Sequence, residues 1–128
     1  MQRILIVEDS ATMRSLVASS LEDLETPIKI VEAESGFEAL RFLPREEFDL
    51  VVTDINMPDI NGLELVSFIK NNPKYATIPL VIVSTEGSER DRDKGLALGA
   101  DAYLIKPFDP EALRQVVADL LAGRPGSG

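Results

Sequence analysis

The sequence contains neither cysteine nor histidine, and each absence removes several kinds of chemistry. Without cysteine there is no disulfide bond, iron–sulfur cluster, thiolate zinc site or thiol nucleophile. Without histidine there is no Ser/His/Asp triad and no zincin motif, and any phosphohistidine chemistry has to involve a second protein. A long apolar run is also missing at the N-terminus, where residues 4–7 are followed at once by Glu8 and Asp9. That run is too short for a signal peptide or a membrane span, so we expect a cytoplasmic protein without membrane association.

Basic residues are few: 13 lysines and arginines against 22 aspartates and glutamates give a net charge of −9. This excess opposes nonspecific binding to nucleic acid or anionic lipid, so we expect no direct nucleic-acid binding. A bound cation would neutralise part of the charge. The 128 residues suffice for one domain with one core. We place that domain at residues 1–122 and interpret residues 123–128, which include no bulky apolar side chain, as a flexible tail, a linker or an expression remnant.

Short apolar runs alternate with amphipathic segments along the chain. The runs suit strands that are buried on both faces of a parallel sheet, and the amphipathic segments suit helices that cover those faces. The alternation predicts a doubly wound, three-layer α/β fold with right-handed crossovers. We predict strands at 3–7, 28–33, 49–54, 80–83 and 102–105, and helices at 11–24, 36–43, 62–71, 88–98 and 110–121.

Several helix ends carry recognisable capping residues. Ser10 or Asp9 can cap the first helix, and the pair Thr26-Pro27 is expected to end it. Gly99 suits a C-cap, and Asp109-Pro110 supplies an N-cap followed by a proline at the first helical position.

Polar side chains follow four of the five predicted strands. Glu8 and Asp9 follow the first strand, Asp54 ends the third, Ser84 follows the fourth and Lys106 the fifth. Because ligands of such sheets bind beyond the carboxyl ends of the strands, we expect these side chains in one crevice. Singly, each has a plainer interpretation: a turn residue for Asp54, helix caps for the acids and the serine, and a solvated strand end for the lysine. Their joint occurrence is what the plainer interpretations do not explain.

Three neighbouring carboxylates would raise one another's pKa unless a cation compensates their charge. Oxygen ligands alone indicate a hard divalent ion, and Mg²⁺ fits best, with two carboxylates, a loop carbonyl such as that of Asn56, and waters. A lysine and a hydroxyl at the far side are donors for anionic oxygens. The set therefore predicts a site for phosphoryl transfer.

These residues, in this order, resemble the receiver domain of bacterial two-component response regulators. The resemblance spans residues 1 to about 122 and is closest in length to the single-domain receivers of chemotaxis signalling. It implies a flavodoxin-like (βα)5 fold with strand order 2-1-3-4-5. It also implies a phosphorylation-dependent switch rather than an enzyme, with self-phosphorylation and autodephosphorylation as its only reactions. The motifs are Glu8-Asp9, Asp54-x-x-Met57-Pro58 with Gly62, Ser84, and Lys106-Pro107-Phe108.

The resemblance assigns chemistry to individual positions. Asp54 matches the acceptor that takes a phosphoryl group from the phosphohistidine of a sensor histidine kinase or phosphotransfer protein. Asp9, Asp54 and the backbone carbonyl of Asn56 would hold Mg²⁺, and Glu8 would act through water. Lys106 would pair with the phosphoryl group, and the peptide bond that follows it is typically cis in the family.

The resemblance also predicts how the signal is read. Ser84 matches the switch hydroxyl, and Tyr103 matches the aromatic residue whose ring moves inward in response, although an aromatic side chain in a strand is also commonly core. The expected readout surface consists of the fourth helix, fifth strand and fifth helix, where a downstream protein target would bind. The charged helix at 88–98 suits a segment that shifts, or simply a solvated face. We expect a monomer or a weak phosphorylation-dependent dimer.

Two other functions stay open at this point. A phosphatase of the haloacid dehalogenase type also uses a strand-end aspartate, Mg²⁺, a Ser or Thr, and a lysine. It places a second aspartate two residues after the first as a general acid, however, and here that position is Asn56, which cannot donate the proton. An interaction module of receiver shape that is never phosphorylated is the second alternative.

Overall fold

The computed structural model describes residues 1–85 and 89–123 of the chain. Its strands lie in one sheet and pair in parallel, in the order β2-β1-β3-β4-β5. The predicted doubly wound fold and its flavodoxin-like strand order are therefore confirmed. The strands are β1 (Gln2–Val7), β2 (Ile28–Ala33), β3 (Leu50–Thr53), β4 (Leu80–Ser84) and β5 (Ala102–Ile105), and the helices are α1 (Ala11–Leu21), α2 (Gly36–Phe42), α3 (Gly62–Asn71), α4 (Glu89–Ala97) and α5 (Pro110–Leu121).

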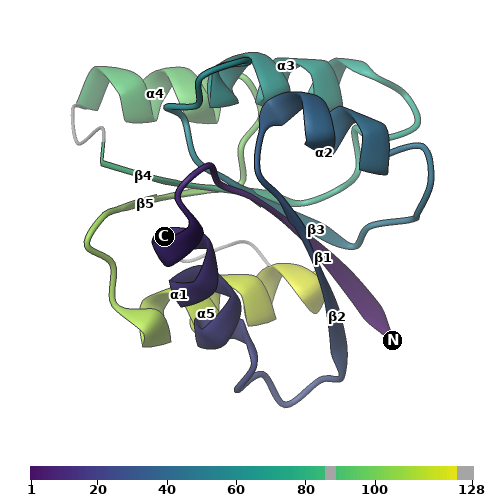
Figure 1. Cartoon of the computed structure of the whole chain (residues 1–128), viewed down its shortest axis with the longest axis vertical. Helices are drawn as coiled ribbons and strands as arrows, with labels where there is room; N and C mark the ends of the chain where they lie inside the picture. The colour runs from purple at the N-terminus through teal and green to yellow at the C-terminus, as the bar shows by residue number, and fades with distance from the viewer. Residues whose placement is uncertain (86–88, 124–128) are drawn as a thin grey trace.

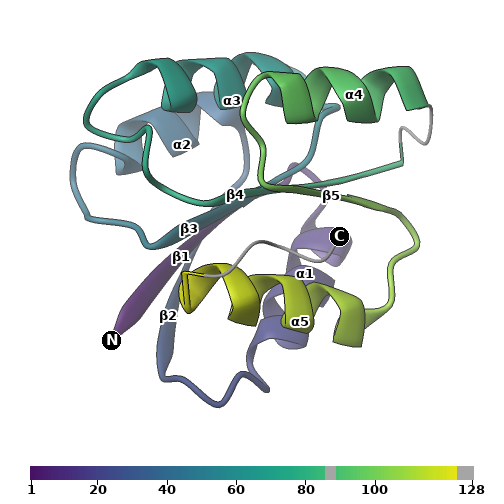
Figure 2. The same cartoon turned by 180° about the vertical axis from the view of Figure 1, so that it is seen from behind.

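The helices form two layers, one on each face of the sheet. Helices α2, α3 and α4 cover one face, and α1 and α5 cover the other (Figure 1). The reverse view shows the same division, with α4 above β4 and β5 (Figure 2). Each face has its own apolar cluster. Along β1, Leu5 and Val7 belong to one cluster, Ile4 and Ile6 belong to the other, and all four are fully buried. Burial on both faces explains why the strands read as continuous apolar runs rather than alternating patterns.

Most predicted elements lie within one or two residues of their observed bounds, and α1 is the main exception. It ends at Leu21 rather than Leu24. The Leu24 N–H donates a hydrogen bond to the Leu21 carbonyl in a turn. The Leu24 side chain still packs against the lower apolar cluster, which lies between the sheet and helices α1 and α5. Leu24 is therefore an apolar core contact, as predicted, but it lies in a turn rather than in the helix. The predicted start of the fourth helix, at 88, lies outside the described residues, and α4 begins at Glu89.

Three of the predicted capping residues lie at helix ends in the structure. Ser10, rather than Asp9, caps α1 by accepting a hydrogen bond from the Met13 N–H. Asp109 caps α5, and the proline lies in its first turn. Gly99, which follows α4, has a φ of +113°, a left-handed conformation that favours glycine. Each of these residues lies where the chain changes direction between two elements.

The parallel register brings the carboxyl ends of the strands to one edge of the sheet. Val7 of β1 pairs with Thr53 of β3, so the residues that follow these two strands are neighbours. Ser84 of β4 pairs with Ile105 of β5, and the Lys106 N–H donates to the Ser84 carbonyl at 2.8 Å. Residues distant in sequence thus meet at this edge.

Candidate functional site

Asp54 lies at the centre of this edge, directly after β3. Its N–H donates to the Val7 carbonyl at 3.1 Å, which extends the pairing of β3 with β1 by one residue. Its Oδ1 accepts a hydrogen bond from the Ile55 N–H at 2.7 Å. The residue is only 6 % exposed. Asp54 is therefore a nearly buried carboxylate with one oxygen held by the backbone, which is more than a turn residue requires.

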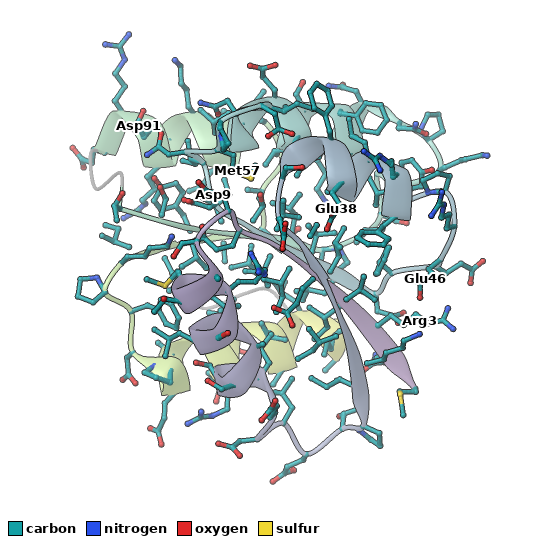
Figure 3. All side chains as sticks on the ribbon, viewed as in Figure 1. Arg3, Asp9, Glu38, Glu46, Met57 and Asp91 are labelled. Carbon is teal, nitrogen blue, oxygen red and sulfur yellow. The ribbon has the colours of Figure 1, made fainter. Side chains whose placement is uncertain are left out.

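Two further carboxylates lie beside Asp54. One oxygen from each of Glu8, Asp9 and Asp54 falls within 4.8 Å of the others. Glu8 and Asp54 are buried and Asp9 is exposed, so the cluster opens to solvent on the Asp9 side. Figure 3 shows Asp9 where β1 leads into α1, whereas Arg3, which forms an ion pair with Glu46 at 3.7 Å, lies at the opposite end of β1. The prediction that these three acids meet is borne out geometrically, and their oxygen-only donors suit a hard cation.

Lys106 is the cation of the cluster, and its side chain is 8 % exposed. Its Nζ donates a hydrogen bond to Glu8 Oε1 and lies 3.5 Å from Asp54 Oδ2. The Lys106–Pro107 peptide bond is cis, as the family resemblance implied. A buried ammonium between two buried carboxylates satisfies part of their charge, because burial of an unpaired charge is costly.

The environment of Glu8 acts on its pKa in opposite directions. Burial raises it, and the nearby Asp54 charge adds to the rise. The hydrogen bond from Lys106 and one from the Ser10 N–H, at 3.0 Å, work to lower it. The net result is a pKa above the usual value for glutamate. Glu8 therefore keeps its proton to a higher pH than an ordinary glutamate.

The two predicted switch residues lie on the β4–β5 side of the cluster. Ser84 ends β4 and is fully buried, and Tyr103 in β5 is 6 % exposed. The Tyr103 ring belongs to the upper apolar cluster, which lies between the sheet and helices α2, α3 and α4. A packing role in the core therefore also fits this residue. Asn56, by contrast, is exposed in the loop after β3, and its role as a carbonyl ligand stays a prediction.

Comparison with known proteins identifies this arrangement. The family model of the response regulator receiver domain matches residues 4–118. The chain belongs to that receiver family. Chemotaxis protein CheY homologues from three strains of Campylobacter jejuni subsp. jejuni are 37 % identical to the receiver over 127 residues, which cover 98 % of it and 97 % of each relative.

Solved structures agree with this assignment. The chemotaxis response regulator CheY4 of Vibrio cholerae is 32 % identical with a TM-score of 0.83, over 94 % of the receiver and 98 % of that chain. A phosphorylated cyanobacterial phytochrome response regulator, RcpA, is 30 % identical with a TM-score of 0.78, over 91 % of the receiver and 88 % of that chain. The receiver is therefore a phosphorylation-dependent signalling switch.

Sequence reasoning missed Asp59, a polar residue near the site. Asp59 lies in the β3–α3 loop, residues 54–61, and its two carboxylate oxygens accept hydrogen bonds from the N–H groups of Gly36 and Phe37, at 3.2 and 2.8 Å. Slight burial works to raise its pKa, but backbone donors outweigh burial and lower that pKa to about 2. The donors are the N–H groups of Phe37, Ile60, Gly36 and Asp59 itself. No sequence signal links this aspartate to a helix that begins more than twenty positions earlier.

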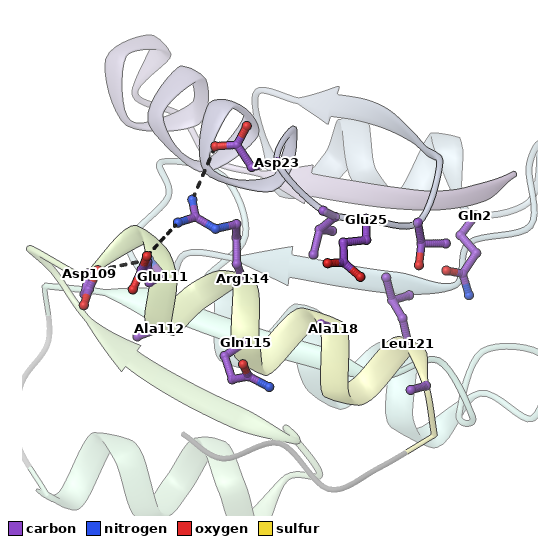
Figure 4. Close-up of a pocket in the computed structure, with 13 residues that line it drawn as sticks. Gln2, Asp23, Glu25, Asp109, Glu111, Ala112, Arg114, Gln115, Ala118 and Leu121 are labelled. Atoms are coloured by element: carbon purple, nitrogen blue, oxygen red, sulfur yellow. Dashed lines mark hydrogen bonds and ion pairs between the residues drawn. The ribbon is translucent and has the colours of Figure 1, made fainter.

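The receiver also has a broad groove away from the acid cluster, between the end of α1 and the length of α5 (Figure 4). Arg114 crosses it, with ion pairs to Asp23 at 3.7 Å and Glu111 at 3.8 Å. None of the predicted site residues lines this groove.

Within residues 1–85 and 89–123, no helix combines the length and the apolar character that crossing a bilayer requires. The cytoplasmic location stays a prediction.

Gly62 holds the β3–α3 loop closed at its base. Its N–H donates to the Ile55 carbonyl at 2.7 Å, and a Cβ at this position would lie 1.9 Å from the Asp54 carbonyl oxygen. Because that oxygen belongs to the backbone beside the site, we expect Gly62→Ala to lower the free energy of unfolding by about 3 kcal/mol or more. Urea denaturation measures the change. Gly123→Ala, where a Cβ would have open space, is the control and should cost about 1 kcal/mol or less. Equal stabilities of the two variants would contradict the close contact.

The low pKa of Asp59 predicts a pH dependence. An aspartate whose pKa falls on folding, here from 3.8 to about 2, stabilises the fold above the unfolded pKa, and this contribution is lost as pH falls through the folded pKa. The difference in melting temperature between the receiver and Asp59→Asn should therefore be largest above about pH 5, shrink as the pH falls, and be smallest below about pH 2. Calorimetry across this range measures it, and a difference that does not depend on pH would count against an ionised Asp59.

Proposed function

We propose that the receiver accepts a phosphoryl group on Asp54 from the phosphohistidine of a sensor histidine kinase or phosphotransfer protein. The observation that carries this proposal is the convergence of three carboxylates and one lysine at the carboxyl ends of β1, β3 and β5. The phosphorylated state of a related regulator supports it. The phosphohistidine has to come from a partner, since the sequence contains no histidine.

The two oxygens of Asp54 have different roles in this proposal. Oδ1 is held by the Ile55 N–H, whereas Oδ2 faces Lys106 and is the oxygen that attacks phosphorus. The new P–O bond forms as the P–N bond to the partner's histidine breaks, and the imidazole keeps the electron pair and takes up a proton. Lys106 donates to the phosphoryl oxygens and stabilises their charge. Transfer thus depends on position and electrostatics rather than on proton abstraction by the receiver.

Asp9, Asp54 and the Asn56 carbonyl are the residues that would hold Mg²⁺, with Glu8 bound through water. Mg²⁺ offsets the charge of the transferring phosphoryl oxygens when it is bound. Asp9 is exposed, so an ion can reach it from solvent, and Asp54, which is nearly buried, would hold the ion beside the reacting oxygen. The fit rests on oxygen donors alone, which Mg²⁺ prefers.

Phosphorylation then changes the face formed by α4, β5 and α5, to which a downstream protein binds. Ser84 and Lys106 are adjacent across β4 and β5, so both can follow a phosphoryl group on Asp54. Helix α4 is held weakly enough to respond, since among its described residues Gly95 alone is buried. Tyr103 lies under this glycine and links the strand to the helix. Probable transcriptional regulators also match, but the chain spans only about half of their length, whereas it spans nearly all of the chemotaxis relatives, which favours a protein target as the output.

We place the functional unit at residues 1–122, acting in the cytoplasm as a monomer or a weak phosphorylation-dependent dimer. Its only reactions are self-phosphorylation and loss of its own phosphoryl group. Asn56 supports this limit, because its amide cannot protonate an ester leaving group as a phosphatase requires. Sustained Mg²⁺-dependent hydrolysis of a generic phosphate ester would favour the phosphatase instead.

Replacement of the acceptor tests the central step. With Mg²⁺ and acetyl phosphate or phosphoramidate, the receiver should gain the mass of one phosphoryl group, and Asp54→Asn should gain none because its amide is not a nucleophile. Intact-protein mass spectrometry measures the change. The matched control is Asp23→Asn, an exposed aspartate far from the site, which should label as the receiver does. A receiver that never labels would favour the unphosphorylated interaction module, and a labelled Asp54→Asn would point to another acceptor.

The sensing role of Lys106 can be tested separately from the phosphorylation of Asp54. Lys106→Ala should still take up some phosphoryl group but should lose the response of α4 and β5, because the ammonium that follows the phosphoryl group is gone. Backbone amide chemical shifts of both elements, with and without beryllofluoride and Mg²⁺, measure the response. Shift changes as large in Lys106→Ala as in the receiver would contradict its sensing role.

A further inference from the structure

The β3–α3 loop is tied to a helix that the proposed chemistry does not use. Asp59, in this loop, accepts hydrogen bonds from the N–H groups of Gly36 and Phe37, the first two residues of α2. The next N–H of the helix, from Glu38, donates to the Ser35 hydroxyl at 3.1 Å. The leading N–H groups of α2 are therefore satisfied by two residues, one local and one 22 to 23 positions away. A local cap such as Ser35 is ordinary, whereas a cap supplied from a distant loop joins two parts of the chain.

A backbone contact at the same place supports this join. A Cβ on Gly36 would lie 2.8 Å from Ile60 Cβ and 3.4 Å from the Ile60 carbonyl oxygen. The start of α2 therefore lies directly against the loop, and only a glycine permits this approach without a shift. The Asp59 hydrogen bonds are not a chance contact between two solvated segments, because the backbones beneath them are packed together.

The other end of the loop is fixed as well. Ile55 donates its N–H to Asp54 Oδ1 and accepts a hydrogen bond from the Gly62 N–H at its carbonyl. Asn56 follows directly, and Asp59 comes three residues later. The segment with the Asn56 carbonyl is thus short and is held at both ends, by the Gly62 contact at its base and by the Asp59 hydrogen bonds at its tip.

We propose that Asp59 is a positioning residue for the phosphoryl-transfer site: by tying the loop to α2, it holds the Asn56 carbonyl in place for a metal ion bound by Asp9 and Asp54. This inference rests on the proposed function, in which that carbonyl is a ligand. Groups that orient a metal ligand contribute to metal affinity without touching the metal, because they reduce the freedom that the ligand loses on binding. Asp59 acts in this way from outside the acid cluster.

The plainer role for Asp59 is a helix cap that stabilises α2 and does nothing more. The chain offers a matched control for this role. Ser35 caps the same helix turn, but its hydroxyl accepts a hydrogen bond from the Glu38 N–H within that turn rather than from the loop. Ser35→Ala should therefore lower stability through α2 alone, whereas Asp59→Ala should lower stability and also release the loop.

Titration of the ¹⁵N-labelled receiver with MgCl₂, followed by backbone amide shifts, tests the proposal. We expect Asp59→Ala to raise the Mg²⁺ dissociation constant about tenfold, at the lower end of the range for groups that orient metal ligands. Asp59→Asn, which keeps one carbonyl acceptor, should fall between the receiver and Asp59→Ala. Ser35→Ala should bind Mg²⁺ as the receiver does, and Asp9→Ala, which removes a proposed ligand, should lose most of its affinity.

Amide hydrogen exchange on the same samples shows whether each substitution acts where intended. Exchange should accelerate at Gly36 and Phe37 in Asp59→Ala and at Glu38 in Ser35→Ala. If exchange changes in this way while Asp59→Ala binds Mg²⁺ as tightly as the receiver, the positioning role is wrong. Equal losses of affinity in Asp59→Ala and Ser35→Ala would also overturn it, since general weakening of α2 would then explain both. If the unsubstituted receiver shows no Mg²⁺ binding, the proposed metal site itself fails, which is a separate result.

Discussion

The structure depends on one electrostatic constraint: buried acids lie together at the carboxyl ends of parallel strands. Glu8 and Asp54 are 3 % and 6 % exposed and both contact the Lys106 ammonium, and one oxygen of Asp9 lies within 4.8 Å of theirs. If all four groups are ionised, three negative charges minus one positive charge leave −2. A divalent cation would balance this remainder, in a site where burial, followed by the nearby Asp54 charge, already raises the pKa of Glu8. A phosphoryl group on Asp54 would add negative charge again, so the cluster responds strongly to either event.

Much of this site can be predicted from the sequence because its signals are local. An apolar run that ends in a polar residue marks both a strand and its carboxyl end, and the parallel arrangement then brings Asp54, Ser84 and Lys106 to one edge. The end of α1 could not be predicted in this way, because Leu24 continues the helical apolar pattern although a turn supplies it. Asp59 was missed for a different reason: its partners are the amides of Gly36 and Phe37, and a backbone donor leaves no residue-specific signal in the sequence.

The β4–β5 side of the sheet offers a physical connection between the acid cluster and α4. Ser84 and Lys106 lie at the ends of neighbouring strands, joined by a backbone hydrogen bond of 2.8 Å. A Cβ on Gly95 would lie 2.7 Å from Ile82 Cδ1 and 3.5 Å from the Tyr103 ring, so α4 lies directly on β4 and β5 at this glycine. A glycine within a helix also weakens it by about 1 kcal/mol relative to alanine. The helix is therefore close to the strands but not strongly held by them.

The two sides of the site thus differ in how firmly they are held. On the β1–β3 side, the loop after Asp54 is fixed at its base by Gly62 and at its tip by Asp59. On the β4–β5 side, α4 contributes a single buried residue among those described, Gly95. This asymmetry suits the proposed switch, in which phosphorylation favours one of two states of the β4–β5 side. If both sides could move, the free energy of phosphorylation would be spread over loop and helix alike. In the proposed switch, a loop held in this way would leave that free energy to act on α4, which has one buried residue among those described.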